Sequence, residues 1–309
     1  MDKSLLFFVL LPFIIIQGYF SSGIPDNNST TDGKQGYTQA LSEEPRCADC
    51  HSDLLESEIV HGPALGSCEN CHQVNMKEHT ENGARGLNLT KSVPELCYSC
   101  HVDEKKDFAA MPDIHQAIEG ENSCTACHSP HSSDVKKLLL TQPKKLCLSC
   151  HNKDFKANGE KTVNIKMLLA NSKVIHPPAE KGCLACHQPH GSTNNYLLIS
   201  AFPKGNYAPA ARDTFALCWE CHDSDLLELA NTDASTNFRE GDKNLHYIHM
   251  TGKKSRSCIM CHNMHASANM YLIEDKVQFG EWGLPINFFP NENGGSCFPG
   301  CHNEKAYTR

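Results

Sequence analysis

The pattern of hydrophobic and polar positions at the start of this chain differs from the pattern in the rest of its 309 residues. Lys3 is followed by an apolar run of 12 residues, Leu5 to Ile16, which is typical of an export signal and too short for a comfortable membrane span. We therefore predict a signal peptide over residues 1–22. Because no clean A-x-A cleavage site follows, an uncleaved anchor is the alternative. Residues 23–44, rich in Ser, Thr, Asn, Gly and Gln, are predicted to be a flexible leader before a folded region over residues 45–309.

A second distinct pattern lies in the aromatic stretch from Asp275 to Ser296. Apolar side chains alternate at Leu284, Ile286 and Phe288, which predicts a short strand or hairpin. The aromatic side chains of this tail either pack over the terminal haem or form a docking surface, and the sequence leaves both open.

The 18 cysteines fall into nine pairs, and each pair is followed at once by a histidine. Eight pairs have the spacing CxxCH, and the ninth is longer by one residue. The nine motifs are Cys47/Cys50/His51, Cys68/Cys71/His72, Cys97/Cys100/His101, Cys124/Cys127/His128, Cys147/Cys150/His151, Cys183/Cys186/His187, Cys218/Cys221/His222, Cys258/Cys261/His262 and Cys297/Cys301/His302.

CxxCH is the attachment signature of c-type haem. Two thiols three residues apart project from one side of a helical turn, where they can add to the two vinyl groups of a porphyrin, and the next residue places an imidazole beneath the iron. Disulfide pairs and zinc ribbons also use CxxC, but neither requires a histidine after the second cysteine in every case. We therefore predict nine covalently attached haem c groups.

The composition limits which fold classes are expected, and the charge limits which kinds of partner are expected. Nine sites in 309 residues leave little chain around each haem, so we expect a mainly α protein with a high loop content and little strand, in which short helices surround a row of haems. Quasi-linear repeats would make it elongated. Aromatic residues are only 7%, so porphyrins would supply much of the apolar core. The formal charge of −8 argues against nucleic acid as a partner.

The motifs belong to a longer repeat. Each unit contains a first CxxCH motif, an upstream histidine, a second CxxCH motif and a closing histidine. Flanking segments repeat as well, as HSSDVKKLLL, HGSTNNYLLI and HASANMYLI after three of the second motifs. Units 1 to 4 and a terminal half unit span Cys47–His79, Cys97–His131, Cys147–His190, Cys218–His265 and Cys297–His302.

Nine further histidines match the number of predicted irons, and we take them as candidate second axial ligands. Four stand seven or nine residues before a second motif, and three stand three residues after its proximal histidine. His79 does not follow this spacing, and His246 and His249 lie three residues apart, where each could serve a different haem; a surface or supporting role is the alternative for these three histidines. The nine are His61, His79, His115, His131, His176, His190, His246, His249 and His265.

The cluster CTACHSPH, residues 124–131, shows what a closing histidine can do. His128 and His131 are too close in sequence to reach opposite faces of one iron, so we expect His131 to serve a different haem and to join two cofactors. The same reasoning applies to the equivalent histidine pairs of units 3 and 4. Pro130 restricts the backbone just before the second histidine and favours an extended conformation there.

These motifs resemble those of a known family. The stretches VHGPALGSCENCH, HQAIEGENSCTACHSPH and VIHPPAEKGCLACHQPH are similar to the doubled-CxxCH multihaem c-type cytochromes, and most similar to the periplasmic subunits of porin-cytochrome conduits, over about residues 45–270. The resemblance implies bis-histidine haems in a wire-like row and electron transfer across the periplasm and outer membrane. It also implies redox protein partners, an outer-membrane porin and an extracellular cytochrome among them.

The sequence therefore favours an exported electron carrier, periplasmic, associated with the outer membrane or extracellular, with no substrate beyond electrons. One alternative is a subunit that assembles with copies of itself into an extracellular cytochrome filament. The other is a multihaem reductase, which needs one iron with an open face. The chain has no CxxCK motif and enough histidines to close every iron, which argues against a reductase.

Overall fold

The structure is a computed structural model, and it describes residues 46–83, 85–157 and 159–309. The predicted signal peptide, residues 1–22, and the predicted leader, residues 23–44, lie outside the described residues. Arg46–Arg309 forms one compact unit. Within the described ranges, no helix is long and apolar enough to cross a membrane.

The α-helices are short, and the α4 helix has nine residues. Asn75, Asn164 and Asn244 begin three of them by accepting a hydrogen bond from the backbone N–H three residues on. Proline starts α5 and α7, where no intrahelical N–H bond is needed. The helices are α1 (Cys47–Cys50), α2 (Met76–Asn82), α3 (Glu95–Tyr98), α4 (Val102–Ala110), α5 (Pro143–Cys150), α6 (Ile165–Asn171), α7 (Pro177–Lys181), α8 (Ala216–Trp219), α9 (Asp225–Glu228) and α10 (Leu245–Thr251).

Single 3-10 turns make up much of the remaining helix. They are η1 (Ser52–Leu55), η2 (Gly62–Leu65), η3 (Cys68–Asn70), η4 (Gln116–Ile118), η5 (Ser123–Ala126), η6 (Lys136–Leu138), η7 (Cys183–Ala185), η8 (Asn195–Leu197), η9 (Arg212–Phe215), η10 (Cys258–Met260) and η11 (Met270–Leu272).

The strands are two to four residues long and pair in small antiparallel sheets. They are β1 (Ile59–Val60), β2 (His72–Val74), β3 (Leu87–Leu89), β4 (Asp113–Ile114), β5 (Ser132–Ser133), β6 (Phe155–Ala157), β7 (Glu160–Thr162), β8 (Val174–Ile175), β9 (Gly191–Ser192), β10 (Arg239–Glu240), β11 (Lys243–Asn244), β12 (Ala266–Ser267), β13 (Lys276–Phe279), β14 (Trp282–Pro285), β15 (Phe288–Asn291), β16 (Gly294–Cys297) and β17 (Lys305–Thr308).

The expectation of a mainly α protein with little strand is wrong. Helix, with the 3-10 turns, makes up 37% of the structure and strand 21%. The physical reason is that many strands are two-residue segments whose partners lie far away in the sequence, and such segments are too short to show a period of two. Most of the motifs form single turns that do not grow into longer helices; the exceptions are Cys147–Cys150, which lies in the eight-residue α5, and the ninth motif, which begins in β16.

Three of these small sheets join neighbouring units. β1 of unit 1 pairs with β5, which directly follows unit 2. In the same way β4 of unit 2 pairs with β9, directly after unit 3, and β8 of unit 3 pairs with β12, directly after unit 4. In each case the strand before an upstream histidine lies against the strand after a closing histidine. The strand pairs therefore hold histidines of two different units side by side.

The predicted strand or hairpin in the tail is confirmed. β13 pairs with β14, and β15, β16 and β17 form a three-stranded sheet. Leu284 lies in β14 and Phe288 in β15, with the buried Ile286 between them. The alternation therefore spans two strands, because the chain turns at Asn287, which has a positive φ of 47°.

In the described chain, four of the nine buried apolar residues form one small cluster, which consists of Ala208, Phe215, Leu227 and Met250. Cys218, Trp219 and Cys258 pack against it. Large apolar side chains elsewhere are well exposed, as at Leu65 and Phe289. A chain that buries so few apolar side chains of its own gains little stability from a protein core, which agrees with a cofactor-filled interior.

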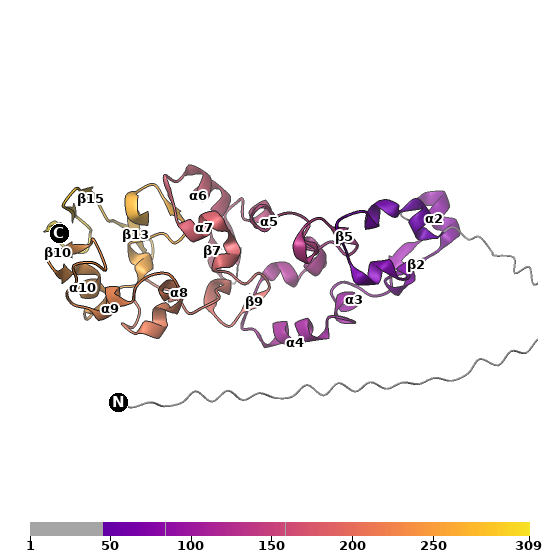
Figure 1. The fold of residues 1–309 in the computed structure, drawn as a ribbon, viewed down its shortest axis with the longest axis horizontal. Helices are drawn as coiled ribbons and strands as arrows, with labels where there is room; N and C mark the ends of the chain where they lie inside the picture. Colours follow the sequence, from indigo (N-terminus) through magenta and orange to yellow (C-terminus); the bar gives the residue numbers. More distant parts are fainter. Residues whose placement is uncertain (1–45, 84, 158) are drawn as a thin grey trace, which may run out of the picture. The chain divides into compact units, whose positions relative to one another are not determined.

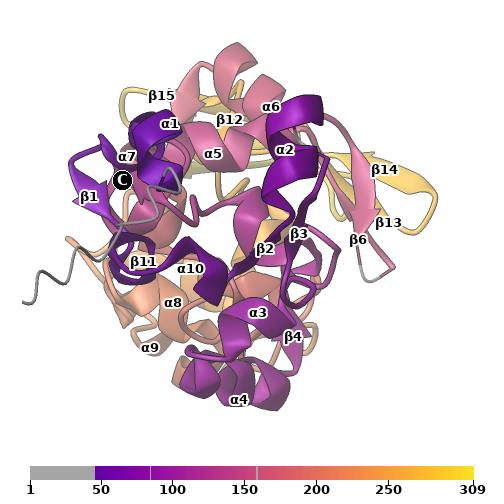
Figure 2. The same ribbon diagram turned by 90° about the vertical axis from the view of Figure 1, so that its right-hand side faces the viewer.

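Within residues 46–309, the elements follow one another in chain order. Figure 1 shows this order, from α2 and β2 through α5 and α8 to α10 and β15. Figure 2 shows β13 and β14 standing out at the side of this unit. Each repeat therefore contacts mainly the repeats next to it in sequence.

The buried cluster predicts a large loss of stability on truncating its central ring. Phe215 is fully buried, so Phe215→Ala should lower the free energy of unfolding of the holoprotein by about 3–5 kcal/mol, measured by chemical denaturation. Phe289→Ala, at a side chain that is 61% exposed, is the control and should change it little. Equal effects of the two variants would contradict the assignment of the core.

Candidate functional site

All nine cysteine motifs lie in the described chain, and most of them form one turn of helix. The first cysteines of the first motifs lie in α1, α3, α5 and α8, and those of the second motifs lie in η3, η5, η7 and η10. In seven motifs the backbone N–H of the proximal histidine donates to the carbonyl of the first cysteine, over 2.8–3.0 Å. The turn presents both thiols on one side. All 18 cysteines are free of disulfide bonds.

Six of the cysteines predicted to bind haem are exposed, and the other 12 are partly buried. The exposed ones are Cys50, Cys68, Cys100, Cys150, Cys221 and Cys301. Five of them are second cysteines, and four of these five belong to the first motifs of units 1 to 4. Cys100 lies just past α3, and Cys301 lies in the turn between β16 and β17. The chain alone therefore does not enclose these thiols, and their attachment to haem stays a prediction.

Within each unit, the first cysteines of the two motifs are neighbours. The thiols of Cys147 and Cys183 share a hydrogen bond, which raises the pKa of Cys147 and lowers the pKa of Cys183 to about 6. Cys218 and Cys258 are paired in the same way. Equivalent neighbours occur in units 1 and 2. Two cofactors attached through such adjacent thiols would be close together.

Across each unit boundary, the second motif of one unit lies near the first motif of the next. Burial raises the pKa of the Cys127 thiol, and the nearby thiolate of Cys150 raises it further. The pKa of Cys186 is raised in the same way by burial and by Cys221. Burial also raises the pKa of Cys261, and Cys297 and Cys301 nearby raise it further. Cys71 similarly acts on the first cysteine of unit 2. The nine motifs therefore form one continuous row in chain order.

The imidazole rings come together in pairs. Among the described residues, eight pairs combine one proximal histidine with one further histidine, with ring centroids 6.0–6.3 Å apart. The pairs are His51/His79, His72/His131, His101/His61, His128/His190, His151/His115, His187/His265, His222/His176 and His262/His246.

These pairs cross the unit boundaries in a fixed pattern. The upstream histidine of one unit faces the first motif of the next unit, as His61 faces His101. The closing histidine faces the second motif of the preceding unit, as His131 faces His72. The same two contacts recur between units 2 and 3 and between units 3 and 4. Each of these boundaries is therefore spanned by two imidazole pairs.

The two histidines with less regular spacing lie where this pattern changes. His79 faces His51, the first proximal histidine of its own unit 1. His246 faces His262, the second proximal histidine of its own unit 4. In these two pairs both rings come from the same unit, whereas in the other six pairs the second ring comes from a neighbouring unit.

The last proximal histidine, His302, lies near His249. Burial lowers the pKa of His249, and the positive charges of Arg256 and His302 lower it further. The His249 ring also stacks on Phe238, with centroids 5.7 Å apart. His302 itself is exposed. The structure thus brings the ninth proximal histidine near the one spare histidine outside the eight pairs.

The spacing of the pairs fits a metal ion between the rings. Metal–imidazole bonds are about 2 Å long, so an ion bound on the line between two imidazoles separates their ring centroids by about 6 Å. Ordinary ring packing spans about 4.5–7 Å, whereas all eight pairs fall within 6.0–6.3 Å. Each pair also includes the ring beside a cysteine motif. The residues present therefore fit a haem iron with two axial imidazoles.

Hydrogen bonds fix which ring nitrogen faces the predicted iron. Because a carbonyl oxygen can only accept, an Nδ1 next to one carries the proton, and Nε2 keeps its lone pair for a metal. Eight histidines donate in this way over 2.6–3.0 Å: His61 to Pro130, His115 to Pro189, His176 to Met264, His128 to Lys137, His187 to Tyr196, His262 to Tyr271, His249 to Leu245 and His302 to Asn303.

Burial favours the neutral form of several of the rings. It is the main cause that lowers the pKa of His246 to about 3 and the pKa of His265 to about 4, and neighbouring imidazoles lower both further. Burial also lowers the pKa of His187 and His190. Neutral imidazole is the form that binds a metal.

The sequence did not reveal two features of this site. In units 2, 3 and 4, the residue before the closing histidine accepts a hydrogen bond from an upstream histidine, so Pro130, Pro189 and Met264 act through their carbonyls. The segments after the closing histidines supply the carbonyls for His128, His187 and His262. The sequence repeats of these segments, HSSDVKKLLL, HGSTNNYLLI and HASANMYLI, could have indicated that they share a role, although not that their carbonyls accept hydrogen bonds from proximal histidines.

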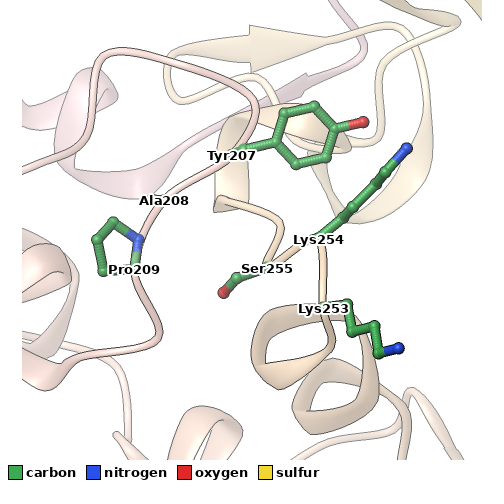
Figure 3. A pocket seen from close by; sticks show the side chains of 6 residues that line it. All are labelled: Tyr207, Ala208, Pro209, Lys253, Lys254 and Ser255. Carbon is green, nitrogen blue, oxygen red and sulfur yellow. The ribbon is translucent and has the colours of Figure 1, made fainter.

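One surface pocket, of about 480 Å³, lies beside the buried cluster rather than at the histidine pairs. Tyr207, Ala208 and Pro209 line one side and Lys253, Lys254 and Ser255 the other (Figure 3). Its lining includes none of the predicted haem-binding residues. Ala208 connects it to the buried cluster near Cys218 and Cys258.

The chain is similar to known multihaem proteins. The family model of the doubled CXXCH motif matches residues 61–106, 115–156 and 176–226. The multiheme cytochrome MtrA of Shewanella baltica is 29% identical over an alignment of 212 positions, gaps included, which covers 62% of this chain and 60% of that protein. The high-molecular-weight cytochrome c of Nitratidesulfovibrio vulgaris is 25% identical over an alignment of 290 positions, gaps included, which covers 77% of this chain and 47% of that protein. The chain thus matches less than two thirds of either relative's length.

The matched family segments begin at upstream histidines and are offset from the units defined above. The segment 61–106 contains the second motif of unit 1 and the first motif of unit 2. His61 and His101 both lie in it and face each other. The segments 115–156 and 176–226 are built in the same way. The family repeat therefore spans a unit boundary, which is where the structure places the imidazole pairs.

The strand pair β4–β9 aligns the histidine pairs of units 2 and 3, and it predicts the effect of a substitution. A Cβ at Gly191 would lie 2.8 Å from the side chains of Ile114 and Met111 and 3.1 Å from the carbonyl of Asp113. Gly191→Val should therefore lower the free energy of unfolding by about 1–3 kcal/mol through overpacking. Gly120→Val, at an exposed glycine with open space around it, is the control.

Chemical denaturation of both holoproteins measures this difference. A Gly191→Val variant as stable as the Gly120→Val variant would contradict the close packing of β4 against β9.

Proposed function

Because this chain belongs to the doubled-CXXCH multihaem c-type cytochromes, we propose that it is an exported electron carrier with nine covalently attached haems. The comparisons confirm the family that the motifs predicted. The single observation that carries the proposal is the continuous row of motifs with eight imidazole pairs spaced for an iron. A row of closely spaced redox centres is what passage of electrons through the protein requires.

In this proposal each haem is attached to the two cysteines of one motif, and the next histidine is its proximal ligand. A second imidazole, in most cases from a neighbouring unit, closes the other face of the iron. The second ligands are His79 for the iron of His51, His131 for His72, His61 for His101, His190 for His128, His115 for His151, His265 for His187, His176 for His222, His246 for His262 and His249 for His302.

The haems would supply one-electron chemistry, and the chain's residues determine how it is used. The adjacent thiols within a unit and the neighbouring motifs across each boundary keep successive haems close. Backbone carbonyls hold the imidazoles in the tautomer that binds iron. Burial favours the neutral form of His246 and His265 and limits water at both rings. None of these roles needs a general acid or base.

The proposed location is the periplasm or the outer membrane, and the proposed partners are redox proteins, with a porin and an extracellular cytochrome among them. The export-like pattern of residues 1–22 supports the location, since covalent haem attachment takes place on the outer side of the cytoplasmic membrane. The similarity to a multiheme cytochrome supports an electron-transfer partner. Assembly into a filament is the alternative, and sharing of ligands between copies would favour it.

The proposal is tested by counting haems and determining the spin state of their irons. Mass spectrometry of the purified holoprotein should give nine haems, and electron paramagnetic resonance should give low-spin ferric signals alone. A high-spin signal of about one iron per chain would instead favour a reductase with an open haem. Protein-film voltammetry with nitrite and hydroxylamine would then look for a catalytic current, which the electron-carrier proposal does not expect.

The ligand assignment across the boundary between units 2 and 3 gives a sharper prediction. His190→Ala should leave nine haems attached but convert the iron beside His128 to a high-spin state, because its second imidazole is lost. The same substitution combined with Cys124→Ser and Cys127→Ser, which removes that haem, should give no high-spin signal.

A matched background controls this result. With Cys183→Ser and Cys186→Ser, which remove the haem next to His190 in sequence, His190→Ala should still produce the high-spin signal. If the two backgrounds behave the other way round, His190 serves the iron of its own unit and the assignment is wrong.

A further inference from the structure

Three segments of the chain share one conformation that neither the motifs nor the axial ligands explain. They follow the second motifs of units 2, 3 and 4, and we call them the closing loops: residues 129–139, 188–198 and 263–273. In each loop, the residue 11 positions after the proximal histidine forms an antiparallel bridge with that histidine. The loop therefore returns to the histidine from which it started.

Each closing loop contains two successive residues with positive φ, and none of them is glycine. They are Lys137/Leu138, Tyr196/Leu197 and Tyr271/Leu272, with φ between 56° and 63°. L-residues other than glycine rarely adopt this left-handed conformation, and consecutive examples are rarer. The same strained pair at the same position in three loops points to a role that requires this backbone geometry.

The left-handed turn directs a carbonyl at the proximal imidazole. The carbonyls of Lys137, Tyr196 and Tyr271 accept a hydrogen bond from Nδ1 of His128, His187 and His262, over 2.7, 2.9 and 2.8 Å. In all three loops the accepting residue stands nine positions after the histidine. The first of the two left-handed residues thus supplies the acceptor.

A buried serine clamps each loop in this shape. The hydroxyls of Ser133, Ser192 and Ser267 donate to the carbonyls of Leu139, Leu198 and Ile273. The same hydroxyl accepts the backbone N–H two residues further on. All three serines are buried, with at most 8% of their surface exposed. The clamp holds the end of the loop close to its start.

The second motif of unit 1 is built differently. Its proximal histidine, His72, lies in β2, which pairs with β3 instead of with a closing loop. The Nδ1 of His72 is buried and has no hydrogen-bond partner among the described residues. The four second motifs therefore divide into three with a carbonyl acceptor and one without.

We propose that the closing loops are positioning devices that set the reduction potentials of three haems. In this inference, which rests on the proposed function, Lys137, Tyr196 and Tyr271 make the haems beside His128, His187 and His262 harder to reduce than the haem beside His72. A hydrogen bond donated by Nδ1 makes the imidazole a stronger donor to iron, which stabilises the ferric state and lowers the potential. The reduction potential is therefore higher at the second motif of unit 1 than at the second motifs of units 2, 3 and 4.

Lys137 allows a clean test because its side chain is exposed and only its backbone takes part. Lys137→Val introduces a β-branched residue that disfavours the left-handed conformation. Lys137→Asn removes the same charge but introduces a residue that adopts this conformation readily. The two variants therefore differ in backbone preference and agree in charge.

Potentiometric titration of the two holoproteins, followed by haem absorbance, measures the effect. Lys137→Val should move one haem's share of the absorbance change to a higher potential, while Lys137→Asn should titrate like the unaltered protein. Equal curves for all three proteins would overturn the inference. Equal shifts for both variants would also overturn it, because they would trace the effect to the lost charge.

Haem counting separates this inference from the function it rests on. Mass spectrometry should give nine haems for the unaltered protein and for both variants, and a lower count in the unaltered protein would instead defeat the proposed function. If Lys137→Val fails to hold its haems, Ser133→Ala replaces it, because this change loosens the same loop without changing charge. A Ser133→Ala protein with nine haems and unshifted potentials would overturn the inference.

Discussion

The pairing of imidazoles from neighbouring units is the constraint on which the rest of this structure depends. Each proximal histidine is fixed by its cysteine motif, so a second ring can reach the far side of an iron only if another segment carries it there. The two-residue strand pairs β1–β5, β4–β9 and β8–β12 do this, since they place upstream and closing histidines together. The ring separations of 6.0–6.3 Å show how constant the result is along the chain.

This constraint explains why so little conventional core is needed. Two imidazole pairs at each boundary from unit 1 to unit 4 would tie the units together through their cofactors, and the porphyrins would take the place of the missing apolar side chains. His79 and His246 complete the pattern within their own units, where no neighbouring histidine is paired with His51 or His262. The closing loops add a second use of the same segments, because they carry the closing histidines and also orient the proximal rings.

Much of the candidate site could be predicted from the sequence, because covalent attachment imposes a local spacing. The cysteines and proximal histidines follow from CxxCH, and the spare histidines from their regular distances to it. The fold class could not be predicted, since strands such as β4 and β9 are two residues long and pair with partners far away in the sequence. The exposure of thiols such as Cys100 and Cys301 was not visible in the spacing either. The acceptor role of Lys137 was equally hidden, because it depends on a backbone carbonyl and a left-handed turn rather than on a side chain.

The central claim is that nine irons lie in one row, each between imidazoles brought together from set positions in the chain. Anomalous scattering at the iron absorption edge from crystals of the holoprotein tests this most directly. The account predicts nine iron peaks in the order of the cysteine motifs, eight of them centred between the imidazole pairs described here and one between His302 and His249. Fewer peaks, or irons whose second ligands come from the same unit at the boundaries of units 2 and 3, would contradict it.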